Sequence, residues 1–170
     1  VASNAGNNLK KCVMELGGSD PFVVLDDADL DKTIPVAIAS RFGNGGQTCI
    51  AAKRFILTPG IAPQFVARFV EAAGKLVVGD PNSDATSLAP MVRPDARDEV
   101  HRQVTASVAA GAKVLIGGEK GPGVCDYPAT ILDNVVPGIP AYSEELFGPV
   151  ASIIYAQNDL DAVRIANDTA

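Results

Sequence analysis

The chain has 170 residues, of which 47% are hydrophobic and 20% are charged, and its formal net charge is −6. That length favours one domain, the acidic balance argues against nucleic-acid binding, and no apolar run approaches the roughly 18 residues of a membrane helix. Three cysteines without a CxxC pair and a single histidine suit a reducing cytoplasm, and they favour neither a disulfide scaffold nor a zinc site.

Strand-like and helix-like patterns alternate along the chain. Apolar β-prone runs predict strands, and apolar residues at every fourth position predict helices. The predicted strands are residues 12–16, 22–25, 54–58, 113–116, 129–135 and 150–155. The predicted helices cover about 30–42, begin near 62, run from 94 to about 110, and cover about 159–167. This alternation predicts an α/β fold in which helices cover a largely parallel sheet.

Local signals refine these elements. Asp27 or Asp29 can cap the first long helix, and Pro35 is expected to kink that helix or to shift its start. The glycine-rich run 43–46 predicts where the helix ends. The basic pairs Lys10-Lys11 and Lys53-Arg54 are interpreted as solvated surface.

Gly46-Gln47-Thr48-Cys49 is the first motif with chemical content. A lone cysteine is usually a small buried side chain. Here Cys49 follows a glycine-rich helix end and two polar residues, which favours an exposed loop whose backbone N–H groups can face a developing oxyanion. A nucleophilic role needs local help to form the thiolate, and the sequence alone does not identify the helper.

Glu15-Leu16-Gly17-Gly18 is the second motif. A carboxylate inside the predicted strand 12–16 must be paired, face an edge or serve a function. The two glycines permit tight backbone geometry or the close approach of a ligand. A cysteine nucleophile with a carboxylate base can attack a carbonyl and release the product with water, provided that the fold brings Cys49 and Glu15 together.

The third motif is Glu145-Leu146-Phe147-Gly148-Pro149-Val150, which leads into a predicted strand. Glu145 can accept two hydrogen bonds from a ribose diol, and Phe147 can pack against a flat heterocycle. The alternative interpretation is an acidic turn without a ligand. No G-x-G-x-x-G or Walker A spacing occurs, so the chain has no dinucleotide-phosphate loop of its own.

In this order, the three motifs resemble those of the aldehyde dehydrogenase superfamily, and the resemblance covers essentially the whole chain. They are similar to its general-base motif, its nucleophile motif and its E-x-F-G-P-V cofactor motif. The resemblance implies the three-layer α/β/α fold of that family's catalytic domain. It also implies that residues 1–20 are the tail of a cofactor-binding domain and that residues 21–170 are a catalytic domain truncated at its C-terminal end.

The resemblance also implies a role for each site residue. Cys49 attacks an aldehyde to give a thiohemiacetal, with its own backbone N–H as one oxyanion donor. Loss of hydride to NAD or NADP leaves a thioester, which a water activated by Glu15 hydrolyses. Glu145 holds the nicotinamide ribose, and Phe147 packs near the nicotinamide ring. In the family, the adenine and phosphate site and the oligomerisation strand lie outside this segment, so we expect a homo-oligomeric parent protein and an inactive isolated chain.

The sequences around Glu15 and Cys49 are similar to those of bacterial succinate-semialdehyde dehydrogenases, which implies a small acidic aldehyde as substrate. Some members with that function place a substrate-gripping arginine six positions before the nucleophile. Here that position is Gly43, and Arg41 is nearby. The alternatives are a dehydrogenase for another small aldehyde, a CoA-dependent acylating enzyme, in which Glu15 is not needed, an esterase or thioesterase, and a non-catalytic relative.

Overall fold

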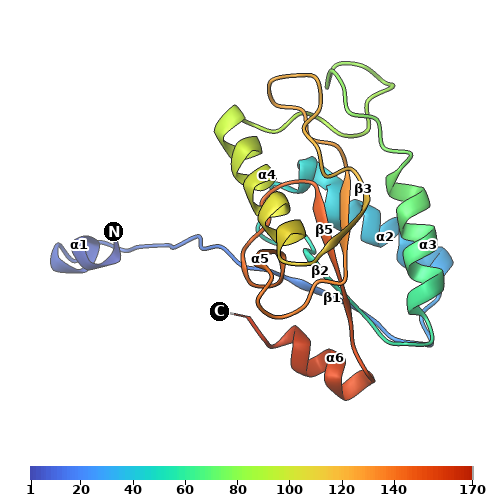
Figure 1. Ribbon diagram of the computed structural model, residues 1–170. Coiled ribbons are helices and arrows are strands. Elements are labelled where there is room, and N and C mark those ends of the chain that lie inside the picture. The colour runs from blue at the N-terminus through green and yellow to red at the C-terminus, as the bar shows by residue number, and fades with distance from the viewer. Residues whose placement is uncertain (170) are drawn as a thin grey trace.

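The computed structural model describes residues 1–169, in which helices flank a central sheet (Figure 1). The strands are β1 (Pro21–Val24), β2 (Arg54–Leu57), β3 (Lys113–Ile116), β4 (Thr130–Asp133) and β5 (Val150–Tyr155). The helices are α1 (Ala2–Asn7), α2 (Leu30–Phe42), α3 (Ala62–Ala73), α4 (Pro94–Ala109), α5 (Pro140–Ser143) and α6 (Asp159–Ala166), with a 3-10 turn, η1 (Gly43–Gly46), after α2. No helix within residues 1–169 has the length and apolar character needed to cross a bilayer.

The sheet has the strand order β1-β2-β5-β4-β3. β1, β2, β5 and β4 run parallel, and β3 pairs antiparallel with β4 at one edge. The prediction of a largely parallel sheet is confirmed. Because neighbouring parallel strands start at the same side, the amino ends of β1, β2 and β5 lie next to one another along one end of the sheet.

Two layers of helices cover the sheet, because the strand side chains alternate between two apolar cores. Phe55 and Leu57 of β2 face the core beneath α2 and α3, whereas Ile56 faces the core beneath α4, α5 and α6. β5 alternates in the same way, with Ile153 on the first core and Ile154 on the second. Figure 1 shows the two helical layers on opposite sides of the sheet, so the three-layer α/β/α arrangement is confirmed.

α2 matters to the site because it leads into the glycine-rich run of the nucleophile motif. Asp29 caps its start, since its carboxylate accepts a hydrogen bond from the backbone N–H of Asp31 at 3.0 Å. Pro35 neither breaks the helix nor moves its start from Leu30. A proline there removes only the one hydrogen bond that its N–H would have donated to the carbonyl of Asp31.

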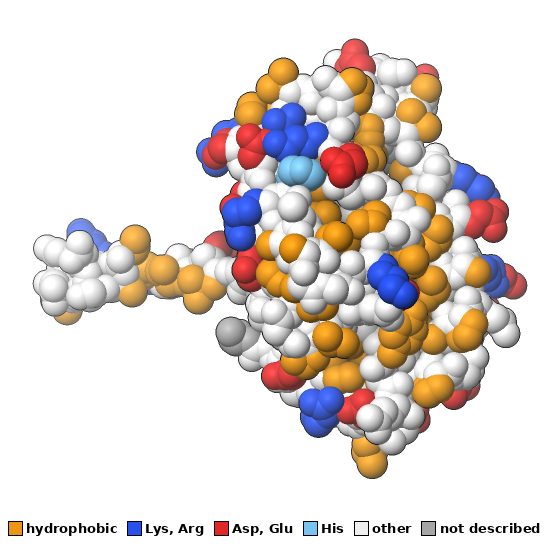
Figure 2. All heavy atoms as spheres, in the orientation of Figure 1, with side chains coloured by type: hydrophobic (Ala, Val, Ile, Leu, Met, Phe, Trp, Pro, Cys, Tyr) orange, Lys and Arg blue, Asp and Glu red, His pale blue; other side chains and the backbone are white. Residues whose placement is uncertain are grey.

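Residues 8–18 form neither helix nor strand. α1 and the start of this segment project away from the sheet (Figures 1 and 2), whereas Gly17 lies against Glu145. The prediction of a strand at 12–16 is wrong: Val13, Met14 and Leu16 are exposed, and no described strand pairs with them. An apolar run forms a stable strand only where a neighbouring strand takes its backbone hydrogen bonds. The assignment of residues 1–20 to a cofactor-binding domain stays a prediction.

The interpretation of Lys53-Arg54 as solvated surface is also wrong, because the two side chains are 1% and 0% exposed. Arg54 donates to the carbonyl oxygens of Ser19 at 2.8 Å, Ile165 at 2.9 Å and Ala166 at 3.0 Å. The last carbonyls of a helix lack partners within the helix, and a buried guanidinium can satisfy several of them at once. Arg54 therefore fastens the end of α6 to the chain just before β1.

Candidate active site

The three motifs meet because each one precedes a strand at the same end of the sheet. The Glu15 segment leads to β1, the Cys49 segment to β2, and the Glu145 segment to β5. These strands are parallel neighbours in the order β1-β2-β5, so their preceding segments converge. Open α/β sheets commonly bind ligands at the carboxyl ends of their strands. In this chain the candidate site lies at the amino ends.

A pocket of about 440 Å³ lies where these segments converge. Its lining consists of Glu15, Leu16, Gly17, Gln47, Thr48, Cys49, Glu145 and Phe147. All four residues predicted from the sequence therefore border one cavity. Cys49 and Glu15 are exposed, and Phe147 keeps 42% of its surface accessible, so each can contact a bound molecule.

Cys49 lies in a tight turn in which the N–H of Ala51 donates to the carbonyl of Thr48 at 3.2 Å. The exposed loop predicted for the cysteine is confirmed. Gly45 and Gly46 make the approach to this turn possible, because their φ angles of +63° and +70° belong to the left-handed region that favours glycine. The chain thus reverses between α2 and β2 with the thiol on the outside.

Arg41, in the last turn of α2, supports this turn from the interior. Its side chain is 0% exposed and donates to the carbonyl oxygens of Gly46 at 2.7 Å and Ala52 at 3.0 Å. Burial lowers the pKa of Arg41 to about 10, against the opposing charge of Glu145, so the guanidinium stays cationic at neutral pH. Since Arg41 is buried and lies outside the pocket lining, it is not placed to grip the carboxylate of a substrate.

The nucleophile motif also touches the third motif, backbone against backbone. A Cβ added at Gly46 would overlap the carbonyl oxygen of Gly148, so only glycine fits there. On the same turn, the Oε1 of Gln47 accepts a hydrogen bond from the N–H of Val92 at 2.9 Å. The Cys49 turn is therefore held by the segment before β5 and by the segment before α4.

Glu145 lies between the base motif and the Cys49 turn. Its Oε1 is 3.6 Å from the Nζ of Lys53, and its Oε2 occupies the space that a side chain at Gly17 would need. Oε1 is buried and accepts no hydrogen bond from the residues described. A buried carboxylate oxygen is costly unless water or a ligand supplies a donor. Here Oε1 faces the Lys53 ammonium, and the exposed 26% of the Glu145 side chain is the part that can meet a bound molecule.

The residues that organise the turn were not predicted. Arg41 lies four positions after Ala37 and seven after Ile34, both buried, so the helical period could have placed it on the buried stripe of α2. Lys53 directly precedes β2, whose residues are all buried. Because a lysine is usually exposed, its charge led to a prediction of surface in place of interior. Gln47 gives no local signal, because its partner Val92 is distant in sequence.

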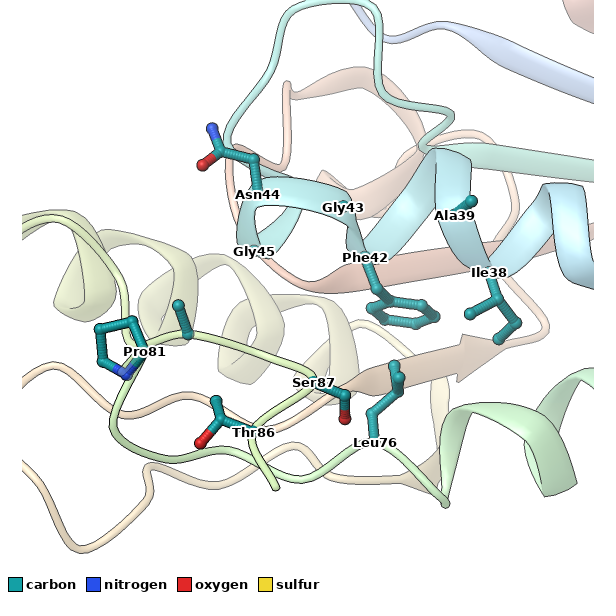
Figure 3. Close-up of a pocket in the computed structure, with 11 residues that line it drawn as sticks. Ile38, Ala39, Phe42, Gly43, Asn44, Gly45, Leu76, Pro81, Thr86 and Ser87 are labelled. Atoms are coloured by element: carbon teal, nitrogen blue, oxygen red, sulfur yellow. The ribbon is translucent and has the colours of Figure 1, made fainter. Parts of the chain in front are cut away.

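A second pocket, of about 370 Å³, lies beside η1 (Figure 3). Figure 3 shows Ile38 and Phe42 of α2 facing Leu76 across it. Gly43, six positions before Cys49, lines this second pocket and not the first. Within residues 1–169, neither pocket has a lysine or an arginine in its lining.

The first pocket combines an exposed thiol, an exposed carboxylate and a second carboxylate that is partly exposed. A thiol and a carboxylate facing one cavity can support covalent catalysis at a carbonyl carbon followed by water attack. In the part of the chain that the structure describes, no group of three or more His, Cys, Asp or Glu side chains could hold a metal ion.

Comparison with known proteins extends this picture. The family model described as the aldehyde dehydrogenase family matches residues 1–170. A succinate semialdehyde dehydrogenase of Escherichia coli, named with NAD(P)+ as its cofactor, is 52% identical over 170 residues, which are 99% of this chain and 37% of that protein. The structure of succinate-semialdehyde dehydrogenase from Burkholderia pseudomallei matches with a TM-score of 0.95 and 34% identity, over 99% of this chain and 35% of that one. Lactaldehyde dehydrogenase from Escherichia coli matches with a TM-score of 0.94 and 34% identity, over 99% and 36%.

Proposed function

Because the chain belongs to the aldehyde dehydrogenase family, we propose that it carries the nucleophile and the base of an NAD(P)-dependent aldehyde dehydrogenase. The main support is the single pocket bordered by Cys49, Glu15, Glu145 and Phe147. The chain spans 37% of the length of the Escherichia coli relative, so the activity is proposed for a polypeptide of that length containing residues 1–170. We expect that polypeptide, here called the full-length enzyme, to form homo-oligomers.

Cys49 is the proposed nucleophile. Its thiolate attacks the aldehyde carbon, forming a C–S bond and an alkoxide that backbone N–H groups of the turn can stabilise. When bound, the nicotinamide supplies the hydride acceptor that converts this adduct into a thioester. Glu15 then takes a proton from a water whose oxygen attacks the thioester carbon, so that the acid leaves and the Cys49 thiolate is restored.

Glu145 and Phe147 are the residues proposed to hold the ribose and the nicotinamide. The carboxylate of Glu145, whose side chain is 26% exposed and borders the pocket, suits a ribose hydroxyl. The half-exposed ring of Phe147 suits a flat heterocycle. The residues present therefore fit a nicotinamide cofactor, and both NAD and NADP stay open.

Succinate semialdehyde is the proposed substrate, on the basis of the names of two relatives. A second candidate is a small aldehyde without a carboxylate, because the lactaldehyde dehydrogenase of Escherichia coli matches at 34% identity, as the Burkholderia structure does. A substrate carboxylate needs cationic or N–H donors in place of its hydration shell. Since neither of these two pockets has a lysine or an arginine in its lining, the cationic donors would come from other parts of the full-length enzyme.

The test is aldehyde oxidation by the full-length enzyme, with succinate semialdehyde and the neutral aldehyde butyraldehyde, each with NAD+ and with NADP+. Cys49→Ser is expected to abolish cofactor reduction, whereas the matched control Cys125→Ser retains it. Glu15→Gln is expected to give one burst of reduced cofactor and then slow turnover, because thioester formation survives and hydrolysis does not. A Cys49→Ser variant with wild-type turnover would contradict the proposal.

Other outcomes would favour the alternatives. Acyl-CoA as the product would indicate an acylating enzyme, and ester hydrolysis without any nicotinamide would reveal an esterase activity. A non-catalytic relative would show Cys49 alkylated by iodoacetamide no faster than Cys12 or Cys125, with no protection by aldehyde. Residues 1–170 alone are expected to show no appreciable dehydrogenase activity, and turnover at the full-length rate would overturn that expectation.

A further inference from the structure

Lys53 lies beneath the turn that carries the proposed nucleophile. Its side chain is 1% exposed, and its ammonium donates to the carbonyl oxygens of Cys49 at 2.7 Å and Ala51 at 3.0 Å. A third carbonyl, that of Thr48, lies 3.5 Å from the same Nζ. A lysine ammonium has three N–H donors, so the cation is surrounded by the carbonyls of this one turn.

The orientation of these carbonyls determines where the N–H groups of the turn point. In a planar trans peptide, the C=O and the following N–H point in opposite directions. The carbonyls of Thr48 and Cys49 face Lys53. The N–H groups of Cys49 and Ile50 therefore point away from the buried ammonium, and Cys49 and Ile50 are both exposed. Lys53 thereby orients the backbone N–H proposed as an oxyanion donor.

The same ammonium faces the carboxylate proposed to hold the ribose. The Nζ of Lys53 is 3.6 Å from the buried Oε1 of Glu145. Burial lowers the pKa of Lys53 and so does the charge of Arg41, whereas Glu145 and Asp20 raise it. Opposite charges at such a separation interact more strongly in a partly buried site than in water.

We propose that Lys53 is a positioning residue that couples Glu145 to the Cys49 turn, so that one cation sets both the ribose-binding carboxylate and the oxyanion donor. This inference rests on the proposed function. Binding of the cofactor at Glu145 then changes the field at the ammonium that orients the nucleophile turn. Lys53 touches no reacting atom itself.

The first test uses Lys53→Met in the full-length enzyme, because methionine fills much of the lysine volume without the charge. The expected result is a rise of about tenfold in the KM of the cofactor and a fall of about tenfold in kcat, with the KM of the aldehyde changed less than about twofold. The control Lys75→Met, on an exposed lysine paired with Glu71, is expected to leave all three values unchanged. The proposal would be overturned if Lys53→Met lost stability while its cofactor KM and kcat stayed near the wild-type values, or if its aldehyde KM rose as much as its cofactor KM.

A double variant separates coupling from independent damage. If Lys53 acts on the cofactor through Glu145, the cofactor KM of Lys53→Met/Glu145→Gln lies within about threefold of that of Glu145→Gln alone. If the factors by which the two single substitutions raise the cofactor KM multiplied in the double variant, the coupling would be contradicted.

The second test uses the 170-residue chain and decides the matter even if Lys53→Met does not fold. Glu145→Gln leaves the ammonium beneath the turn without its counter-charge, so alkylation of Cys49 by iodoacetamide is expected to accelerate about threefold at neutral pH. The matched control is Glu144→Gln. It removes the same charge at the neighbouring position, where the carboxylate is paired with Arg102 and not with Lys53. Equal rates in both variants would overturn the coupling. If the full-length enzyme oxidises no aldehyde, the proposed function fails, while this comparison still tests the link between Lys53 and Glu145.

Discussion

The glycine-rich run before Cys49 permits a graded test, because its glycines differ in conformation and surroundings. A Cβ at Gly46 would overlap the carbonyl oxygen of Gly148, lie 2.7 Å from its carbonyl carbon and overlap the guanidinium of Arg41. Gly45 shares the left-handed conformation, but a Cβ there would lie 3.0 Å from the flexible end of Gln47 and at an ordinary contact distance of 3.7 Å from the carbonyl oxygen of Ala89. Gly43 has a φ of −54° and no heavy atom within 4 Å of the added carbon.

These differences predict how much each glycine-to-alanine substitution changes the free energy of unfolding. A left-handed conformation costs an alanine about 1–2 kcal/mol, and losing the charged hydrogen bond from Arg41 to the Gly46 carbonyl costs about 1.5–3 kcal/mol. Gly46→Ala is thus expected to destabilise the chain by about 3–5 kcal/mol, and Gly45→Ala by about 1–2 kcal/mol. Gly43→Ala is expected to be neutral or to stabilise by up to about 1 kcal/mol, because alanine restricts the unfolded chain.

The assay is urea unfolding of the 170-residue chain, followed by far-ultraviolet circular dichroism because the chain contains no tryptophan. Alkylation of Cys49 in native buffer gives a second readout of whether the turn is intact. A Gly46→Ala variant within about 1 kcal/mol of Gly43→Ala would refute the close-approach explanation. The same would follow if Gly45→Ala were the more destabilising of the two left-handed variants.

Three further predictions concern other parts of the chain. A hydrogen bond from the Thr58 hydroxyl, with others from the N–H groups of Ile61 and Gly60, lowers the pKa of Asp26. Asp26→Asn should therefore lower the urea midpoint at neutral pH, and its difference from wild type should vanish as the pH falls through that lowered pKa, below 3.8. Asp27→Asn, on an exposed neighbour, is the control. Arg54→Met should accelerate amide hydrogen exchange in α6 by about tenfold or more, because the helix end loses its carbonyl partners, and unchanged exchange would refute that role for Arg54. Phe147→Ala in the full-length enzyme should raise the cofactor KM about fivefold and leave the aldehyde KM unchanged. An unchanged cofactor KM would show that the Phe147 ring does not contact the cofactor.

Most elements after residue 20 could be predicted because their signals are local, whereas the short helix α5 was not predicted. The apolar residues of α3 recur every four positions, and Phe65 and Phe69 are buried as that period requires. The glycines after α2 end that helix as their composition indicates. The candidate site residues were predicted for a different reason, because the types and order of the motifs resemble those of a known family. The structure places all four beside one pocket, and their roles stay a proposal.

The misses share one cause: the groups that pair with these residues, or that accommodate them inside the protein, leave no mark on the local sequence pattern. The run at 12–16 has the composition of a strand, but no described strand lies beside it. Lys53 and Arg54 carry charges that usually mark a surface, yet carbonyls contributed by their own turn and by α6 accommodate them inside. Neither strand pairing nor the origin of such partners is encoded in a local period, so a single sequence cannot reveal them.

The position of β5 at the middle of the sheet determines when this domain can finish folding. β1, α2 and β2 are close in sequence and can associate early, but β2 must wait for a partner that begins only at Val150. During synthesis, β2 therefore presents an unpaired edge until β5, which ends at Tyr155, has left the ribosome, and such edges favour aggregation. Docking of β5 also brings Glu145, Phe147 and Gly148 against the Cys49 turn. A nascent or stalled chain thus holds its thiol in an unfinished pocket, and the reactive site is assembled in the same step that closes the sheet.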